Sequence, residues 1–138
     1  LVTHLFPGGM LAVQMPMNTE EPLFRLIRQM AEEAKWQLNL AGIPTVKTLS
    51  PETYYEILSK CAVDFDLWET TYCHPMENHQ ALVEWAKGTS LRPYLDRLGE
   101  KGAAFEAELL SRVTALYPVQ SDGKVLLHFR RFFFTAVR

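Results

Sequence analysis

The stretch KVLLHFRRFFFTAVR, residues 124–138, is apolar on both of its alternating faces. Successive side chains of an extended chain point to opposite sides. One side carries Val125, Leu127, Phe129, Phe133 and Val137, and the other carries Leu126, Phe132, Phe134 and Ala136. A Val- and Phe-rich run that follows turn residues, here Ser121-Asp122-Gly123, is typical of a strand covered on both sides. We therefore predict a strand over 124–137 in the middle of a sheet.

Three basic side chains interrupt this strand, and they have two interpretations. His128, Arg130 and Arg131 either reach solvent near a strand end or line a pocket as cations. The sequence favours the first interpretation and leaves the second open.

Length and composition limit the possible classes of protein. A chain of 138 residues with 48% hydrophobic residues fits one domain with a core of its own. The net charge of -2, with no basic run interleaved with aromatic residues, gives no reason to expect a nucleic acid or an anionic membrane as partner.

The two cysteines favour a cytoplasmic protein. Cys61 and Cys73 are too far apart for a CxxC pair and lack histidines at metal-binding spacing. We expect buried free thiols, no disulfide and no metal site. The N-terminal residues lack the charged region of a signal peptide, and their apolar stretch is too short to span a bilayer. The absence of Met at residue 1 fits a chain that starts inside a longer protein, and N-terminal processing would look the same.

Periodicity predicts two further strands and five helices. Asn18 with Glu21 indicates a capping box for the first helix, Ser50-Pro51 and Asn78 indicate the starts of others, and His74-Pro75 indicates the end of a strand. The expected strands cover residues 10–15 and 63–73. The expected helices cover residues 19–39, 51–60, 78–87, 90–98 and 100–117. Three strands are few for a sheet buried on both faces, so part of the sheet is expected to be missing.

Motifs that would define a catalytic site are absent from the sequence: it has no GxGxxG, GK[ST], HExxH or GxSxG. Long polar and aromatic residues instead follow the predicted strand 63–73. Among them, Arg92, with an imidazole at His74 and a phenol at Tyr94, offers the donors that carboxylate recognition requires. The alternative is that His74 is an ordinary strand-end histidine, Arg92 a surface cation and Trp85 a core residue.

Several stretches together resemble one known family. LFPGGMLAVQMPMN, residues 5–18, resembles the segment that leads into the fifth strand of class I S-adenosylmethionine-dependent methyltransferases. The longer segments WETTYCHPMENHQALVEWAKGTSLRPYLDRL, residues 68–98, and ALYPVQSDGKVLLHFRRFFFTAVR, residues 115–138, are more specific. They are similar to members of that family that methylate a carboxylate of trans-aconitate or a similar small acid.

The resemblance covers nearly the whole chain but only the C-terminal half of such an enzyme. It implies an α/β, Rossmann-like fold with about three strands in the order first, third, second, the last antiparallel, and about five helices. It also implies that the cofactor S-adenosylmethionine binds in an N-terminal half that this sequence lacks, so the chain alone is expected to be inactive. Strand 10–15 would then be an unpaired edge, open to self-association.

The resemblance further implies an acceptor site for a small carboxylate substrate. His74, Arg92 and Tyr94 are the expected carboxylate ligands, Trp85 and Met15 the expected apolar walls, and the helices between residues 78 and 98 the expected cover. A non-enzymatic interaction or dimerisation module derived from a methyltransferase is the alternative function. A methyltransferase of the same fold that acts on another small molecule is a further one.

Overall fold

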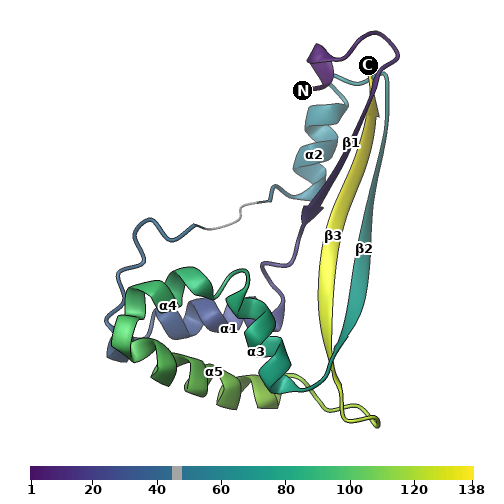
Figure 1. Ribbon diagram of the computed structural model, residues 1–138. Coiled ribbons are helices and arrows are strands. Elements are labelled where there is room, and N and C mark those ends of the chain that lie inside the picture. The colour runs from purple at the N-terminus through teal and green to yellow at the C-terminus, as the bar shows by residue number, and fades with distance from the viewer. Residues whose placement is uncertain (45–47) are drawn as a thin grey trace. The chain divides into compact units, whose positions relative to one another are not determined.

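The computed structural model describes residues 1–44 and 48–138, which form five α-helices, three 3₁₀-helices and three strands (Figure 1). In chain order these elements are η1 (Val2–His4), β1 (Met10–Pro16), α1 (Pro22–Ala31), η2 (Ala34–Trp36), α2 (Pro51–Leu58), β2 (Asp64–Met76), α3 (His79–Lys87), α4 (Arg92–Leu98), η3 (Gly99–Lys101), α5 (Gly102–Leu116) and β3 (Val125–Val137). None of the helices in the described ranges combines the length and the apolar character needed to cross a membrane.

The three strands form one sheet with β3 in the centre. The strand order is β1-β3-β2, and β1 pairs with β3 in the antiparallel direction, from Met10 opposite Val137 to Pro16 opposite Arg131. The predicted α/β class, the strand order, the antiparallel last strand and the central place of 124–137 are therefore confirmed. β1 lies at an edge of this sheet, as expected.

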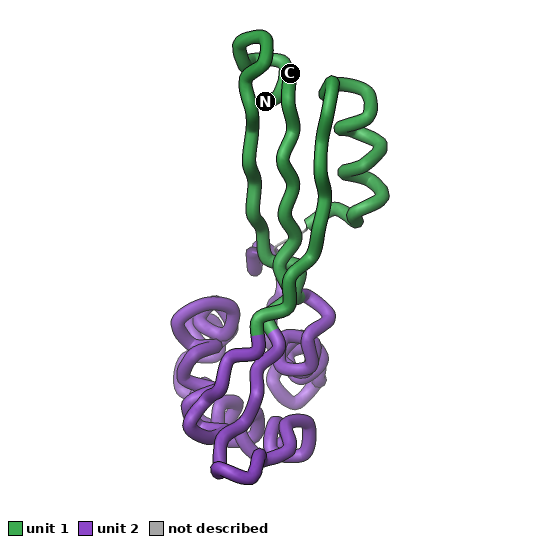
Figure 2. The backbone as a smooth tube through the Cα atoms, turned by 90° about the vertical axis from the view of Figure 1, so that its right-hand side faces the viewer, with its two compact units in different colours: residues 1–18, 47–72, 129–138 green, residues 19–46, 73–128 purple. Residues whose placement is uncertain are grey.

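The chain divides into two compact units (Figure 2). Unit 1 consists of residues 1–18, 47–72 and 129–138, and unit 2 of residues 19–46 and 73–128. The expectation from chain length that all 138 residues form one domain stays a prediction.

The core of unit 1 forms where α2 packs on the C-terminal part of β3. Phe132, Phe134 and Ala136 are buried there together with Leu58 of α2. The Tyr54 ring stacks on Phe132 with a centroid distance of 5.3 Å. One helix thus covers one face of the strand in this unit.

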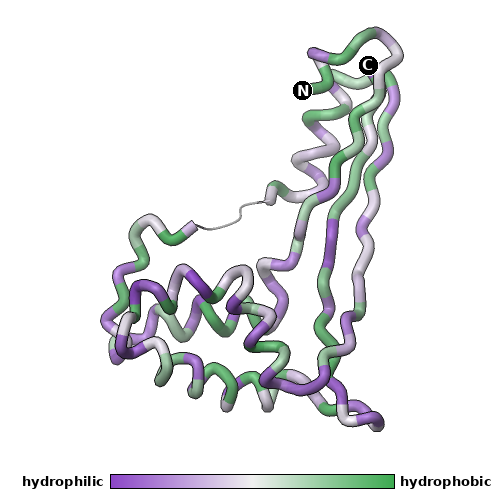
Figure 3. The backbone as a smooth tube through the Cα atoms, viewed as in Figure 1, coloured by the Kyte–Doolittle hydropathy of each residue, from purple (hydrophilic) through white to green (hydrophobic). Residues whose placement is uncertain are grey.

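Unit 2 is mainly helical, with α5 at its centre. α5 packs against α1, α3 and α4. Along α5, hydrophobic residues recur between hydrophilic ones (Figure 3), and Phe105, Leu109 and Val113 are fully buried. This four-residue spacing places one face of the helix in the core.

The buried face of β3 changes along the strand. In unit 2 the odd-numbered Val125 and Leu127 are fully buried, whereas in unit 1 the even-numbered Phe132, Phe134 and Ala136 are buried. Adjacent side chains point to opposite sides of a strand, and Phe129 is the last odd-numbered residue of β3 that is buried. This change explains why the sequence is apolar in both alternating sets.

Two predicted helix caps are confirmed. The Ser50 side chain accepts a hydrogen bond from the backbone N–H of Thr53, with Pro51 at the first helical position. The Asn78 side chain accepts one from the N–H of Ala81 at 2.9 Å. Such caps satisfy backbone donors that a helix leaves unpaired at its start.

The prediction of one helix over 19–39 is wrong at both ends. The N-cap is Glu21, whose side chain accepts from the N–H of Leu23, and not Asn18. The helix ends at Ala31, and Glu33 is extended before the short η2. The physical reason is tertiary, because Glu33, Lys35 and Trp36 each contact α5 and a continuous helix would place them differently.

Two other local expectations need correction. Strand β2 does not stop before His74-Pro75 but continues to Met76, and it can do so because an edge strand tolerates a proline that donates no hydrogen bond. Both cysteines are free thiols, yet Cys61 is only half-buried and Cys73 is exposed, because β2 turns that side chain toward solvent.

Candidate functional site

The five residues predicted to bind an acceptor are divided between the two units. Met15 lies on β1 in unit 1, partly buried against that unit's core. His74, Trp85, Arg92 and Tyr94 all lie in unit 2, on β2, α3 and the start of α4. Four of the five predicted residues therefore lie in the same compact unit.

The two candidate ligands on α4 occupy different sides of that helix. Residues two positions apart on a helix do not share a face. The Arg92 side chain is 71% exposed, and its Nε donates to Asp96 at 3.0 Å. Tyr94 is 8% exposed and belongs to the unit 2 core, and its burial raises the pKa of the phenol. Arg92 is thus the accessible donor, and the Tyr94 ring packs in the core.

His74 and Trp85 differ in the same way. His74 is exposed near the end of β2. Trp85 is partly buried against the unit 2 core, with its ring centroid 6.0 Å from that of Phe24 on α1. The interpretation of Trp85 as an apolar wall and its interpretation as a core residue are both compatible with this position.

The basic residues of β3 occupy solvent-facing positions. His128 and Arg130 are exposed, and Arg130 Nε donates to the carbonyl oxygen of Met17 at 3.2 Å. The Arg131 guanidinium lies over the Phe129 ring at 4.8 Å from its centroid. Of the two interpretations of these cations, exposure to solvent fits His128 and Arg130.

Unit 2 also contains a buried acid that was not among the residues predicted from the sequence. Glu21, at the start of α1, is 9% exposed, and it accepts hydrogen bonds from the Tyr117 hydroxyl and from the backbone N–H of Leu23. Burial raises the pKa of this carboxyl, while the two hydrogen bonds and nearby His128 act in the opposite direction. Burial and the hydrogen bond to Glu21 likewise raise the pKa of Tyr117.

A histidine extends this buried pair. His79 Nε2 lies 2.8 Å from the carbonyl oxygen of Tyr117. A carbonyl oxygen only accepts, so the Nε2–H of His79 is the donor. The contacts of Glu21, Tyr117 and His79 tie together the starts of α1 and α3 and the end of α5. Only the pairing of Glu21 with Pro22 hinted at this in the sequence, since a proline at N1 places the preceding residue at the cap.

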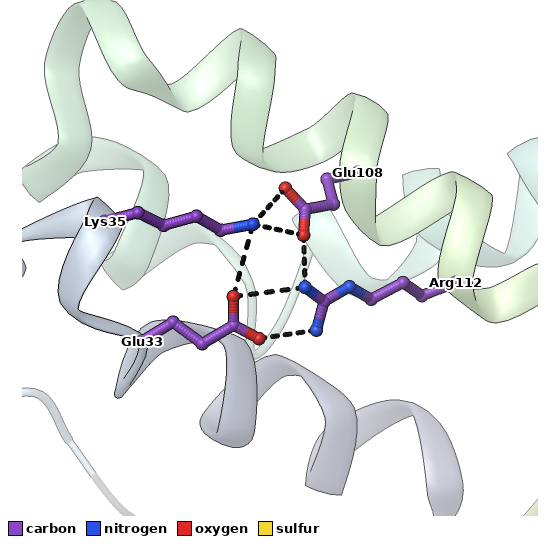
Figure 4. A network of polar contacts seen from close by, with 4 residues as sticks. All are labelled: Glu33, Lys35, Glu108 and Arg112. Atoms are coloured by element: carbon purple, nitrogen blue, oxygen red, sulfur yellow. Dashed lines mark hydrogen bonds and ion pairs between the residues drawn. The ribbon is translucent and has the colours of Figure 1, made fainter.

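A network of four charged residues holds the segment after α1 against α5 (Figure 4). Arg112 Nη2 lies 3.1 Å from Glu33 Oε2, and Lys35 Nζ lies 2.7 Å from Glu108 Oε2. Lys35 also pairs with Glu33, and Arg112 with Glu108. Within this network the pKa values of both carboxyls are lowered, chiefly by hydrogen bonds from Arg112 to Glu33 and from Lys35 to Glu108. Its partly exposed pairs position the chain rather than carry chemistry.

A cleft of about 520 Å³ opens next to that network in unit 2. None of the five predicted site residues lines it. Its lining residues come from the segment that follows α1 and from the end of α4 with η3: Trp36, Gln37, Leu38, Asn39, Ala41, Arg97, Leu98 and Lys101. No short sequence motif indicates this cleft, because its two walls are some 60 residues apart in the sequence.

Across 1–44 and 48–138, no group of three or more His, Cys, Asp or Glu side chains is arranged to hold a metal ion.

Comparisons with known proteins confirm the resemblance seen in the sequence. No family model matches the chain. Curated proteins that match it from end to end are, by name, methyltransferases. Specifically, each is a trans-aconitate 2-methyltransferase: the chain is 45% identical over 99% of its length to that of Variovorax paradoxus (strain S110), 42% over 100% to that of Rhodopseudomonas palustris (strain HaA2), and 44% over 99% to that of Yersinia pestis (strain Pestoides F).

The matches cover only part of those relatives. The chain spans about half the length of each, between 54% and 55%. This share is consistent with the expected resemblance to the C-terminal portion of such a protein.

Proposed function

We propose that this chain forms the acceptor-binding part of an S-adenosylmethionine-dependent methyltransferase that acts on a carboxylate of trans-aconitate or a similar small acid. The supporting observation is the 42–45% identity to trans-aconitate 2-methyltransferases over 99–100% of the chain. The reaction would yield a methyl ester. The protein would be cytoplasmic, with no nucleic acid or membrane among its partners.

The proposed ligands of the acceptor are His74, Arg92 and Tyr94, with Trp85 and Met15 as apolar walls. Arg92 contributes most to this proposal, because its guanidinium is exposed and only its Nε is engaged by Asp96. The terminal nitrogens of a guanidinium can bind a carboxylate in a bidentate manner. The Tyr94 ring is packed in the core, so only its hydroxyl could contact the acceptor.

A carboxylate acceptor needs no general base. Its oxygen is already ionised at neutral pH, and the acceptor half has only to orient it and to limit the access of water. The described residues accordingly need to supply positive charge and shape, and Arg92 and His74 supply donors at the surface of unit 2.

Among the described residues, no glycine lies in a turn that leads from a strand into a helix. A donor such as S-adenosylmethionine is commonly held by a glycine-rich turn between a strand and a helix, whereas Gly8 and Gly9 precede a strand. We therefore place the donor site in residues outside this chain and expect the chain alone to be inactive. A calorimetric titration of the chain with S-adenosylmethionine is expected to give no binding heat. Saturable binding would contradict this placement.

Replacement of Arg92 by Ala in a full-length protein that contains this chain tests the acceptor proposal. We expect the KM for trans-aconitate to rise about 10- to 100-fold, as for the loss of a hydrogen bond to a charged group of about 1.5–3 kcal/mol. The donor affinity should stay unchanged. Arg25→Ala, at an exposed position of α1 in the same unit, is the matched control. An equal loss of acceptor and donor affinity in the Arg92 variant would show that Arg92 is structural.

Self-association through β1 is a second part of the proposal. β1 is an edge strand whose Met10 side chain is 64% exposed. An edge with unpaired backbone groups can pair with another copy of the chain.

A further inference from the structure

The cleft beside η2 has the size of a small-molecule site. Its volume of about 520 Å³ lies within the range of roughly 300–1,000 Å³ that is common for ligand pockets. One wall is the segment from Trp36 to Ala41, and the other is formed by Arg97 and Leu98 at the end of α4 and Lys101 of η3. All of these residues belong to unit 2.

The charge of the cleft is positive and not neutralised by the described residues. Arg97 and Lys101 are its only ionisable lining residues, and neither forms an ion pair with a carboxylate in the ranges 1–44 and 48–138. Arg97 Nη1 donates to the carbonyl oxygens of Asn39 and Ala41, at 2.7 and 2.6 Å, and Lys101 Nζ donates to Gln37 Oε1 at 3.1 Å. Most other cations of unit 2 do pair with acids: Arg28, Lys35, Lys87, Arg92, Arg112 and Lys124.

Further donors line the same cleft. The indole N–H of Trp36 is buried and has no acceptor among the described residues, although Trp36 is only 8% exposed. A buried donor without a partner is costly. Gln37 and Asn39 use their side-chain oxygens to accept from Lys101 and from the N–H of Ala41, which leaves their NH2 groups as donors.

The wall that carries these donors is held in a defined conformation. Gln37 has a left-handed backbone with φ of 51°, and Gly42 has φ of 73°. A Cβ at Gly42 would lie 3.5 Å from Arg97 Nη2, so the loop passes close to the guanidinium. Just before this wall, the network of Glu33 and Lys35 with α5 fixes the chain, and the Trp36 ring packs on Phe105 at 5.0 Å. A fixed wall lowers the entropy lost when a ligand binds.

The apolar residues of the cleft distinguish an organic ligand from an inorganic ion. Leu38, Leu98 and the Trp36 ring contribute apolar surface beside the two cations. Carbon atoms of a ligand gain from contact with such surface, whereas a hydrated inorganic anion does not. The favoured ligand therefore has a short carbon skeleton and at least two separate anionic groups.

We propose that this cleft is a binding site for a small organic di- or tricarboxylate, held by Arg97 and Lys101 and by the side-chain NH2 groups of Gln37 and Asn39. The site is separate from the proposed acceptor ligands, since none of His74, Arg92 and Tyr94 lines it. The inference does not depend on methyl transfer, because it rests only on the cleft, its charge and its donors.

Nuclear magnetic resonance of the ¹⁵N-labelled chain, titrated with citrate at constant ionic strength, tests the proposal. We expect saturable shifts of the Trp36 indole N–H and of the side-chain NH2 groups of Gln37 and Asn39. Lys101→Gln should weaken binding at least ten-fold, and Lys101→Arg, which keeps the charge, should restore most of it. Arg25→Gln removes an exposed cation of the same unit outside the cleft and should leave binding unchanged.

Three outcomes would overturn the proposal. Equal citrate affinity in the Lys101→Gln variant would show that Lys101 does not contribute to a site. Shifts that centre on His74 and Tyr94 and disappear in Arg92→Ala would place the ligand at the proposed acceptor residues instead. Inorganic phosphate that binds the cleft as tightly as citrate would reveal general attraction of anions and no preference for an organic ligand.

Discussion

At the scale of single residues, Glu21 and Tyr117 depend on each other. The Tyr117 hydroxyl donates to the Glu21 carboxyl and accepts from the backbone N–H of Leu23 at 3.0 Å. Both side chains are buried, so removal of either one would leave the other with only its contact to the backbone N–H of Leu23. A buried polar group without a hydrogen bond costs more free energy than the bond itself contributes.

Tyr117→Phe is therefore expected to destabilise the chain by about 1–3 kcal/mol, since it leaves Glu21 and the Leu23 N–H with fewer partners. Urea unfolding followed by circular dichroism measures the change. Tyr55→Phe is the matched control, because Tyr55 is 54% exposed on α2 and its ring contact with Phe65 does not involve the hydroxyl. Equal effects of the two replacements would show that the buried hydrogen bonds of Tyr117 do not stabilise the fold.

The pH dependence of stability should report Glu21 directly. Burial raises the pKa of its carboxyl above the ordinary value of 4.5, so the folded chain holds this proton more tightly than the unfolded chain. The contribution of Glu21 is then fully present below pH 4.5 and is lost as the pH rises through the folded pKa. The loss is about 1.4 kcal/mol for every pH unit by which the folded pKa exceeds the ordinary one.

Glu21→Gln removes this titration and keeps a side chain of similar size. The free energy of unfolding of the original chain, minus that of the variant, should fall between pH 4 and pH 7. Unfolding in urea at a series of pH values measures it. A difference that rises with pH would mean that hydrogen bonds from Tyr117 and Leu23, which lower the pKa, outweigh burial.

At the scale of secondary structure elements, β3 shows most clearly what each side of a strand contributes. Phe132 is 1% exposed and belongs to the unit 1 core. The next residue, Phe133, points to the opposite side, where its ring stacks on Trp68 at 5.3 Å with an interplanar angle of 6°. The two phenylalanines therefore have the same chemistry and different surroundings.

Phe132→Ala should cost about 3–5 kcal/mol, because it opens a cavity in a packed core. Phe133→Ala is expected to cost clearly less, because it removes mainly a ring pair worth about 0.5–1.5 kcal/mol beyond its buried area. Thermal unfolding of the two variants beside the original chain gives the comparison. Equal losses would contradict the assignment of the buried face in this part of β3.

Local signals in the sequence were sufficient for some elements and not for others. Ser50 and Asn78 could be recognised as caps because a cap involves residues only three positions apart. The end of α1 at Ala31 could not, because the apolar spacing continues past it to Leu38. That end depends on contacts of Glu33, Lys35 and Trp36 with α5, more than 60 residues away, which no local pattern contains.

The candidate sites also differ in whether local sequence was sufficient to predict them. Arg92 and His74 could be proposed because they stand in stretches that resemble a known family, and the structure places them on accessible surface of one unit. The cleft with Arg97 and Lys101 could not be proposed, since its donors meet only when two distant segments fold together. The burial of Tyr94 could not be predicted either, because α4 has only seven residues and its periodic pattern is too short to define a buried side.

At the scale of the whole molecule, the proposed self-association depends on the open edge of β1. Ala12 and Gln14 are exposed on this strand, and neither carries the charge that natural edge strands often use to prevent pairing. We expect light scattering to show self-association that increases with concentration. A single monomeric species at high concentration would contradict this part of the proposal.

Ala12→Lys should reduce that self-association, because a lysine on an edge strand opposes pairing with a second strand. Ala115→Lys adds the same charge at an exposed position of α5 and is the matched control. Light scattering of the two variants at equal concentration measures the difference. An equal reduction in both would mean that net charge, and not the edge of β1, controls association.

The pairing of β1 with β3 also has a consequence for synthesis on the ribosome. Met10 lies opposite Val137, so the first strand of the sheet cannot find its partner until nearly all of the chain has been made. At about 5–20 residues per second, that wait is on the order of ten seconds. During this time unit 2, whose residues 19–46 and 73–128 emerge earlier, can fold while β1 still lacks its partner β3. A nascent chain that stalled before β3 would therefore present the apolar side chains of β1 to cellular chaperones.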